Sequence, residues 1–180
     1  VKLVLSDEIF FKQPPSVRAD ILVSGGVILF ASLFTKNENW IGIDYHKVST
    51  GRGAGNILMS GVITGSAKLT VIGSATVTLS AANDSTFSGA VTVDSGVLSV
   101  GADTNLGANT GRLTLNGGAL LANASFTLHA NRALTMTAAS GLQAASGTTL
   151  TYLGDIAAGT NTLTINGNSQ TGTVVLGGNN

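Results

Sequence analysis

The chain has no cysteine, and only 10% of its 180 residues are charged. The absence of cysteine excludes disulfide bonds and thiolate metal sites. An average soluble domain has about 25% charged residues, so Ser, Thr, Asn and Gly must cover most of this protein's surface. The formal net charge is zero, which gives no electrostatic basis for binding nucleic acid or an anionic membrane.

Aromatic residues and proline are also scarce, and they are unevenly distributed along the chain. Residues 1–52 contain 11 of the 18 charged residues, six of the nine aromatic residues and both prolines. Residues 53–180 contain 20 of the 24 glycines. The composition therefore predicts two parts: an N-terminal cap or assembly segment over residues 1–52 and a repetitive domain over residues 53–180.

An apolar-Thr-apolar triplet recurs throughout the second part at nearly constant intervals, except for a longer last one. Its copies begin at Leu69, Val91, Leu113, Leu134 and Leu163. A second apolar column repeats with the same period, at Val77, Leu98, Leu120 and Leu142. A looser third column consists of Leu106, Leu128 and Leu150. Three short strands in about 22 residues predict an all-β, parallel β-solenoid, with apolar columns inside and threonines outside.

Two features of the last repeats depart from this period. The interval between Leu134 and Leu163 is longer than the others, so we expect residues 154–159 to lie within a looped-out turn. The segment Thr173–Leu176 is similar to Thr76–Leu79, but only the earlier copy continues into a Phe-Ser-Gly sequence. This difference predicts that the last coil is unfinished.

Residues 83–101, NDSTFSGAVTVDSGVLSVG, resemble the autotransporter-associated β-strand repeat. Phe87 stands where that family usually has Tyr, and Asn105-Leu106-Gly107 supplies the ending of its pattern. The resemblance extends over about residues 55–180 and does not include the N-terminal segment. It implies a right-handed parallel β-helix in a passenger-type protein that is secreted or exposed on a bacterial cell surface. The repeat is a scaffold, and the resemblance implies no catalytic residue and no cofactor.

Residues 21–34 form an uncharged stretch in the N-terminal segment. Because a membrane span needs about 20 residues, we expect a buried structural segment, with membrane association or export as alternatives. An open solenoid end needs a cover, so this segment is expected to cap the first coil or to insert into a neighbouring subunit. The candidate assembly residues are Val1, Leu3, Leu5, Ile21, Val27, Leu29, Phe30, Phe34, Val174 and Leu176.

The charged residues offer few candidates for catalysis or metal binding. Some β-helices are polysaccharide lyases or hydrolases, which need acids and bases on one outward face. Asp94 and Asp103 are expected on one coil, but Asp94 occupies the turn position that we assign to Asn116 and Asn166 in later coils. We therefore expect it to stabilise a turn.

Several further residues could have either a structural role or a functional one. His129 and Arg132 flank a turn, and we expect both to be solvated corner residues. Asp44 and His46 are an alternative metal-ligand pair for which no third ligand is evident. The outward threonines do not form continuous columns along the coils. The sequence therefore does not favour binding to ice or to another crystalline surface.

These observations favour a non-enzymatic, extracellular or cell-surface structural solenoid. We expect it to be adhesin-like, or to assemble head-to-tail into a filament or a biofilm matrix. Its expected partners are copies of itself or the rest of a longer passenger, with a glycan or a host surface as a further contact. A carbohydrate-active β-helix enzyme is the alternative.

Overall fold

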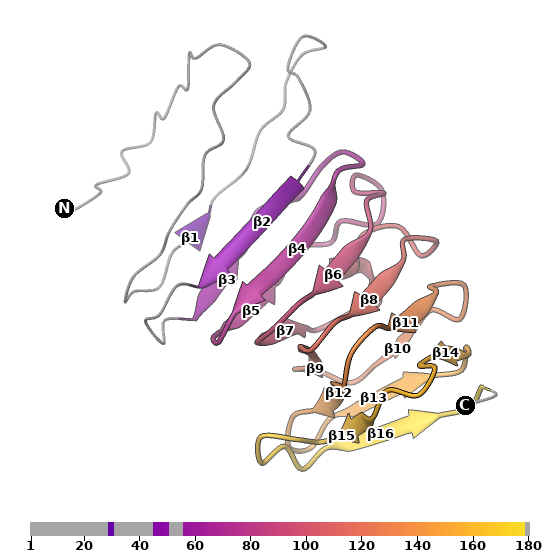
Figure 1. Ribbon diagram of the computed structural model, residues 1–180. Helices are drawn as coiled ribbons and strands as arrows, with labels where there is room; N and C mark the ends of the chain where they lie inside the picture. Colours follow the sequence, from indigo (N-terminus) through magenta and orange to yellow (C-terminus); the bar gives the residue numbers. More distant parts are fainter. Residues whose placement is uncertain (1–28, 31–44, 51–55, 179–180) are drawn as a thin grey trace, which may run out of the picture.

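The computed structural model describes residues 29–30, 45–50 and 56–178, which form a stack of coils (Figure 1). The first sheet consists of β2 (Tyr45–Thr50), β4 (Lys68–Gly73), β6 (Val91–Val93), β8 (Leu113–Leu115), β11 (Leu134–Met136) and β14 (Ile156–Ala157). The second sheet consists of β1 (Leu29–Phe30), β3 (Ile57–Met59), β5 (Thr76–Leu79), β7 (Val97–Val100), β9 (Ala119–Ala122), β12 (Ser140–Ala144) and β15 (Leu163–Ile165). The third sheet consists of β10 (Phe126–Leu128), β13 (Thr149–Tyr152) and β16 (Thr173–Leu176).

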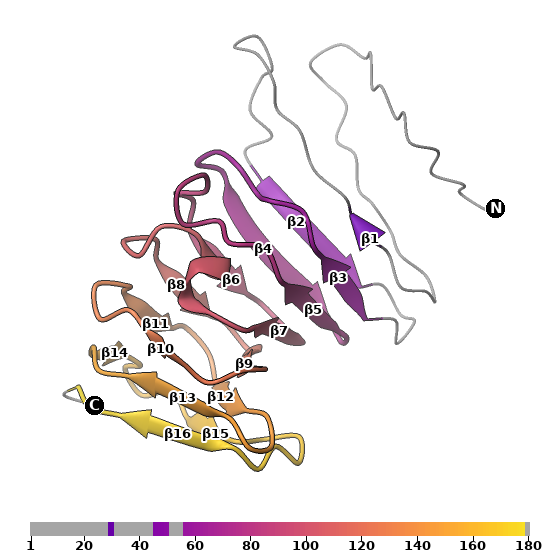
Figure 2. The same cartoon turned by 180° about the vertical axis from the view of Figure 1, so that it is seen from behind.

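The chain visits the first, second and third sides of the stack in turn, and neighbouring strands pair in parallel. A solenoid of about 5 turns results over residues 57–176, with about 22 residues per coil, which confirms the predicted fold class. The third side changes along the stack, as Figure 2 shows. Its early coils contain a bridge between Gly65 and Phe87 and the 3-10 helix η1 (Asp103–Leu106), and its later coils contain β10, β13 and β16.

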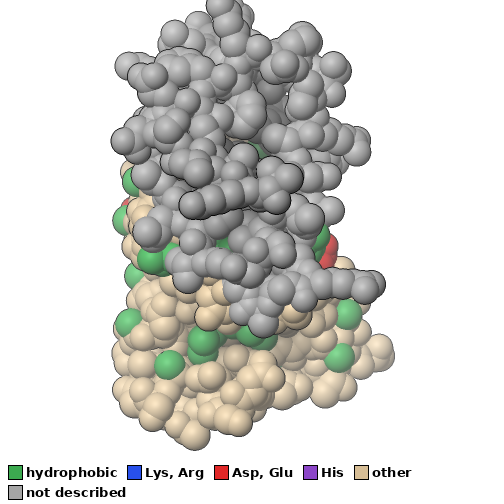
Figure 3. Space-filling view, turned by 90° about the vertical axis from the view of Figure 1, so that its left-hand side faces the viewer, with side chains coloured by type: hydrophobic (Ala, Val, Ile, Leu, Met, Phe, Trp, Pro, Cys, Tyr) green, Lys and Arg blue, Asp and Glu red, His purple; other side chains and the backbone are tan. Residues whose placement is uncertain are grey.

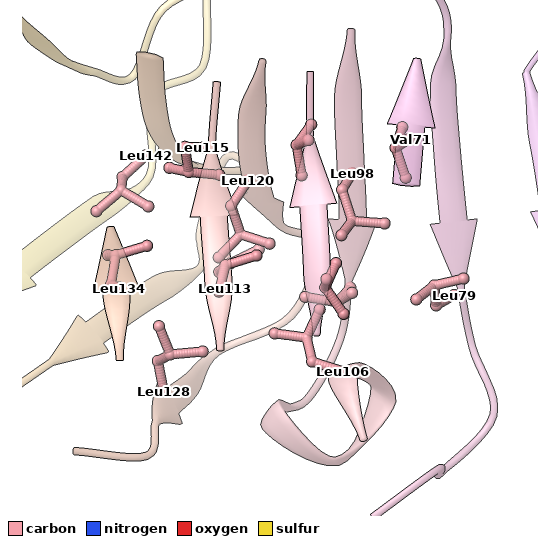
Figure 4. Close-up of a cluster of buried hydrophobic side chains, with 14 of the residues drawn as sticks. Val71, Leu79, Leu98, Leu106, Leu113, Leu115, Leu120, Leu128, Leu134 and Leu142 are labelled. Carbon is pink, nitrogen blue, oxygen red and sulfur yellow. The ribbon is translucent and has the colours of Figure 1, made fainter. Parts of the chain in front are cut away.

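The predicted apolar columns form the core of the solenoid (Figure 4). In the second sheet, Leu120 pairs with Leu98 on one side and with Leu142 on the other. In the first sheet, Leu113 and Leu115 are fully buried, whereas Thr114 between them is only partly buried. This alternation follows from the two-residue period of a strand, and it confirms the predicted inward and outward faces of β8. Thr92, which pairs with Thr114 from β6, is instead buried, so the predicted exposure of the threonines does not hold in every coil.

The first sheet ends differently from the sequence-based expectation. Leu134 pairs with Ile156, which lies one coil further along the chain, so β14 continues the column that contains Leu69. Leu163 is instead in β15, which pairs with β12 in the second sheet. The expected looped-out turn over residues 154–159 is therefore wrong. A two-residue Ile-Ala strand lacks the threonine of the other copies, so the triplet pattern could not detect it.

The third sheet corrects two further expectations. Phe126 pairs with Leu150, and Leu128 pairs with Tyr152, so the predicted third column was out of register. Strand β16 pairs with β13 in this sheet and is not the counterpart of β5 in the second sheet. The last coil thus has one strand in each sheet, and the prediction of an unfinished coil is wrong. A strand of Thr and apolar residues can belong to either sheet, so only the observed strand pairing shows to which sheet β16 belongs.

Two short pieces of the N-terminal segment extend the solenoid. Strand β1 pairs with β3 in the second sheet, and β2 pairs with β4 in the first sheet. The candidate assembly residues outside the described part of the chain are Val1, Leu3, Leu5, Ile21, Val27 and Phe34. Among the residues that the structure describes, no helix has the length and apolar character of a membrane span.

Candidate functional site

Asp94 is part of a ladder of side chains at the corner between the first and second sheets. Asn116 Nδ2 donates a hydrogen bond to Asp94 Oδ1 (3.1 Å), and Thr137 Oγ1 donates one to Asn116 Oδ1 (2.8 Å). This corner ladder joins three successive coils at an exposed edge. Asp94 therefore bonds to the turn of the next coil.

Asn166 does not belong to this corner, contrary to the expected equivalence with Asn116. It follows β15 in the second sheet, where its Oδ1 accepts a hydrogen bond from the backbone N–H of Ala144 (2.9 Å). Asn166, Asn168 and Ser169 have φ angles of 52°, 56° and 61°. The turn after β15 thus uses left-handed backbone at three non-glycine residues, a conformation that Asn tolerates better than most residues do.

Arg132 and Asp103 form an ion pair inside the wall of the solenoid. Arg132 is 0% exposed, with Nε 2.8 Å from Asp103 Oδ1 and Nη2 3.1 Å from Oδ2. Its guanidinium also donates to the backbone carbonyls of Gly111 (3.0 Å) and Gly107 (3.0 Å). The planar fork of arginine suits these several acceptors. The expectation of a solvated Arg132 is wrong, whereas His129 is exposed as expected.

Tyr152 extends this buried network to the following coil. Its hydroxyl donates to the carbonyl of Arg132 (2.8 Å) and also lies 3.2 Å from the carbonyl of Asp155. Burial raises the pKa of Tyr152 above its ordinary value, and the nearby charge of Asp155 raises it further. The phenol therefore stays neutral and acts as a hydrogen-bond donor that joins two coils.

Two buried asparagines complete the polar interior, and they carry a structural role that the sequence patterns did not predict. Asn83 Oδ1 accepts from the N–H of Ile63 (2.7 Å), and Asn83 Nδ2 donates to the carbonyl of Asn105 (2.7 Å). Asn105 Nδ2 donates to the carbonyl of Ala81 (2.9 Å). These bonds satisfy backbone groups that a buried corner would otherwise leave unpaired. The spacing of the two asparagines by one coil was the available signal.

The threonine column of the first sheet and the candidate metal-ligand pair offer less evidence for a functional site than the polar network does. Thr92 pairs with Thr70 and Thr114, and the rank ends where Thr135 meets Ala157 in β14. His46 lies in β2, whereas Asp44 lies outside the described residues. In the described part of the chain, no group of three or more His, Cys, Asp or Glu side chains could hold a metal ion.

The last coil leaves its apolar columns partly uncovered. Ile165, which pairs with the fully buried Leu142, is 42% exposed. Leu163, Val174 and Leu176 are partly buried and pack against the core. The candidate assembly residues Val174 and Leu176 thus lie in the last strand of the third sheet, whereas Leu29 and Phe30 form β1 at the opposite end of the second sheet.

Three sides of stacked parallel strands, with a polar network at the corners, define the class of this protein as a parallel β-solenoid. No family model, no curated protein and no solved structure matches the chain. The likeness to the autotransporter-associated repeat therefore stays a prediction, and the solenoid fold is what the chain is shown to have.

Proposed function

We propose that the chain is a non-enzymatic structural solenoid that forms part of an extracellular or cell-surface assembly. In this role the stacked coils supply a stiff, largely uncharged rod, and contacts are made along its surface or at its ends. The expected settings are an adhesin-like surface protein, a filament or a biofilm matrix of bacterial origin.

The observation that carries this proposal is the structural use of the candidate catalytic groups. Asp103 is held by Arg132 in a bidentate ion pair, and Asp94 bonds to Asn116 in the corner ladder. A general acid or base must reach substrate with its carboxyl group available for proton transfer. Carboxylates that hold coils together are poor candidates for that task.

The described surface supports the same proposal. On the side that Figure 3 shows, it consists mainly of uncharged polar side chains and backbone, with separate small hydrophobic areas. Lys, Arg, Asp and Glu are few throughout residues 53–180 of the sequence. The exposed uncharged polar side chains are suited to hydrogen bonding with a neighbouring surface, such as a glycan. They are less suited to binding that is driven by charge.

A polysaccharide lyase or hydrolase is the second candidate, and an activity assay separates the two. The purified chain is incubated with a panel of acidic and neutral polysaccharides, and new reducing ends and unsaturated products are measured. The structural proposal expects no turnover. Turnover by the intact chain that disappears in Asp94→Ala or in Asp103→Ala, with folding preserved by circular dichroism, would overturn it. A glycan array tests separately for binding without turnover.

A further inference from the structure

The chain contains two Asn-Gly sequences, Asn116-Gly117 after β8 and Asn166-Gly167 after β15. Asparagine is a chemically labile residue. In its deamidation, the backbone nitrogen of the following residue bonds to the side-chain Cγ, and the bond between Cγ and Nδ2 breaks. Nδ2 leaves as ammonia with the proton of the backbone nitrogen, and water then opens the cyclic imide to aspartate or isoaspartate. A following glycine hinders this attack least, because it has no Cβ.

Asn116 is exposed, and its amide is held by side chains of the preceding and the following coil. Asp94 Oδ1 lies 3.1 Å from Asn116 Nδ2, the nitrogen that would leave. The attack places negative charge on the side-chain oxygen of Asn116, and a nearby carboxylate opposes the formation of that charge. Asp94 therefore slows the reaction at Asn116.

The nucleophile of this reaction is also held. The backbone N–H of Gly117 donates to Ser140 Oγ (2.9 Å), and Ser140 Oγ donates to the carbonyl of Ala138 (2.9 Å). The nitrogen gives up its proton when it bonds to Cγ, so its hydrogen bond to Ser140 has to break first. Ser140 therefore restrains the nitrogen that would attack Asn116.

Asn166 is bound to the backbone on both sides of its amide. Its Oδ1 accepts from the N–H of Ala144 (2.9 Å), and its Nδ2 donates to the carbonyl of Gly172 (2.6 Å). Both bonds are partly buried, so moving the amide would leave two backbone groups without these partners. We expect such local opening to be rarer at Asn166 than at the exposed Asn116.

We propose that Asn116 is a site of spontaneous deamidation, and that Ser140 and Asp94 set its rate. The reaction needs no reagent other than water, which reaches the exposed turn. Its aspartate product replaces the Nδ2 donor with a carboxylate oxygen beside Asp94. Two like charges then repel each other where a hydrogen bond joined the coils. The modification thus weakens the corner ladder and adds negative charge to a part of the chain that has little charge.

The corner two coils earlier provides a matched control for Ser140. The N–H of Gly73 donates to Ser95 Oγ (2.8 Å), as that of Gly117 does to Ser140, and the two glycines have φ angles of 108° and 100°. The residue before Gly73 is Ile72, which has no side-chain amide. Ser95→Ala therefore removes the same kind of hydrogen bond without releasing an Asn-Gly sequence.

The intact chain and the variants Ser140→Ala, Asp94→Ala and Ser95→Ala are incubated at mildly alkaline pH, and circular dichroism verifies that each is folded. Peptide mapping by mass spectrometry follows the conversion of each asparagine, and an isoaspartate methyltransferase labels the isoaspartate product. In the intact chain, we expect Asn116 to react several-fold faster than Asn166. Ser140→Ala and Asp94→Ala should each increase the rate at Asn116 by about 3–10-fold, the factor that one hydrogen bond contributes. Ser95→Ala should change neither rate.

Asn166 serves as an internal control in each variant. An equal increase at Asn166 would show that the substitution acts by loosening the whole fold, and it would overturn the roles of Ser140 and Asp94. Equal rates at Asn116 and Asn166 in the intact chain would also overturn the proposal. So would a rate at Asn116 that neither Ser140→Ala nor Asp94→Ala increases.

The consequence for the corner ladder is tested with Asn116→Asp, which reproduces the charge of the aspartate product. At neutral pH its urea unfolding midpoint should be lower than that of the intact chain, because the carboxylates at positions 94 and 116 repel each other. The exchange variant Asp94→Asn/Asn116→Asp, in which amide and carboxylate change places, should recover most of the loss. An unchanged midpoint in Asn116→Asp, or no recovery in the exchange variant, would contradict the proposed effect on the ladder.

Discussion

Arg132 and Asp103 come from different coils and form a bidentate ion pair in which the arginine has no exposed surface. The pair joins η1 to the turn that follows β10 in the next coil. The backbone carbonyls of Gly107 and Gly111 accept two further hydrogen bonds from the same guanidinium. A single side chain therefore satisfies several acceptors of the preceding coil.

Replacing Asp103 with Asn should strongly destabilise the fold. The substitution leaves the buried guanidinium of Arg132 without its counter-ion, and removing one partner of a buried pair costs about 3–5 kcal/mol. The Asp103 side chain is 16% exposed, so we expect a loss near the lower end of that range. Urea unfolding followed by circular dichroism measures the change. Asp84→Asn, at an exposed position, is the control, and equal stability of the two variants would contradict the assigned role.

The inward and outward faces of β8 predict opposite tolerance at adjacent positions. Leu115→Asp places an unpaired carboxylate in the core, and we expect a loss of several kcal/mol, comparable to the stability of the whole domain. Thr114→Asp, at a partly buried outward position, should cost much less. Thermal unfolding of both variants measures the contrast. Similar damage at the two positions would show that the strand faces are misassigned.

Gly89 is a position where any side chain meets backbone. An added Cβ would lie 2.1 Å from the carbonyl oxygen of Ala67 and 2.6 Å from the ring of Phe87. Gly89→Ala should therefore lower the free energy of unfolding by about 1–3 kcal/mol, as overpacking does. Gly147→Ala is the matched control, because its Cβ would meet nothing within 4 Å and only its φ of +75° opposes alanine. A larger loss in the control than in Gly89→Ala would refute the crowding argument.

The raised pKa of Tyr152 predicts a loss of stability at alkaline pH. The unfolded chain releases the phenol proton near its ordinary pKa of 10.0, whereas the folded chain retains it to higher pH. The unfolded state then binds fewer protons, so this contribution to stability is complete below about pH 10 and decreases as pH rises from there.

Tyr152→Phe provides the test of this pH dependence. At neutral pH the variant should be about 1 kcal/mol less stable, because it lacks the hydrogen bond to the carbonyl of Arg132. Urea unfolding from about pH 8 to about pH 11 should show the difference between the two chains becoming smaller as pH rises. A constant difference across this range would refute the pKa shift.

The sequence by itself determined the period, the fold class and most of the inward columns. The spacing of Leu69, Val91, Leu113 and Leu134 was enough to identify a solenoid and its period, because a parallel stack of coils requires equivalent apolar residues at a constant interval. The alternation around Thr114 likewise identified the inward and outward faces of β8, because successive side chains of a strand point to opposite faces.

Only the tertiary structure decided which strands share a sheet at the last coil and which polar residues are buried. Ile156 and Leu163 are both apolar and both precede a small or hydroxyl residue, so their sheets differ only through the strands beside them. Arg132 gives no local sign of burial, because its counter-ion and its carbonyl acceptors come from a neighbouring coil. Periodicity is a property of the chain alone, whereas strand pairing and the satisfaction of a buried charge depend on residues that are brought together only by folding.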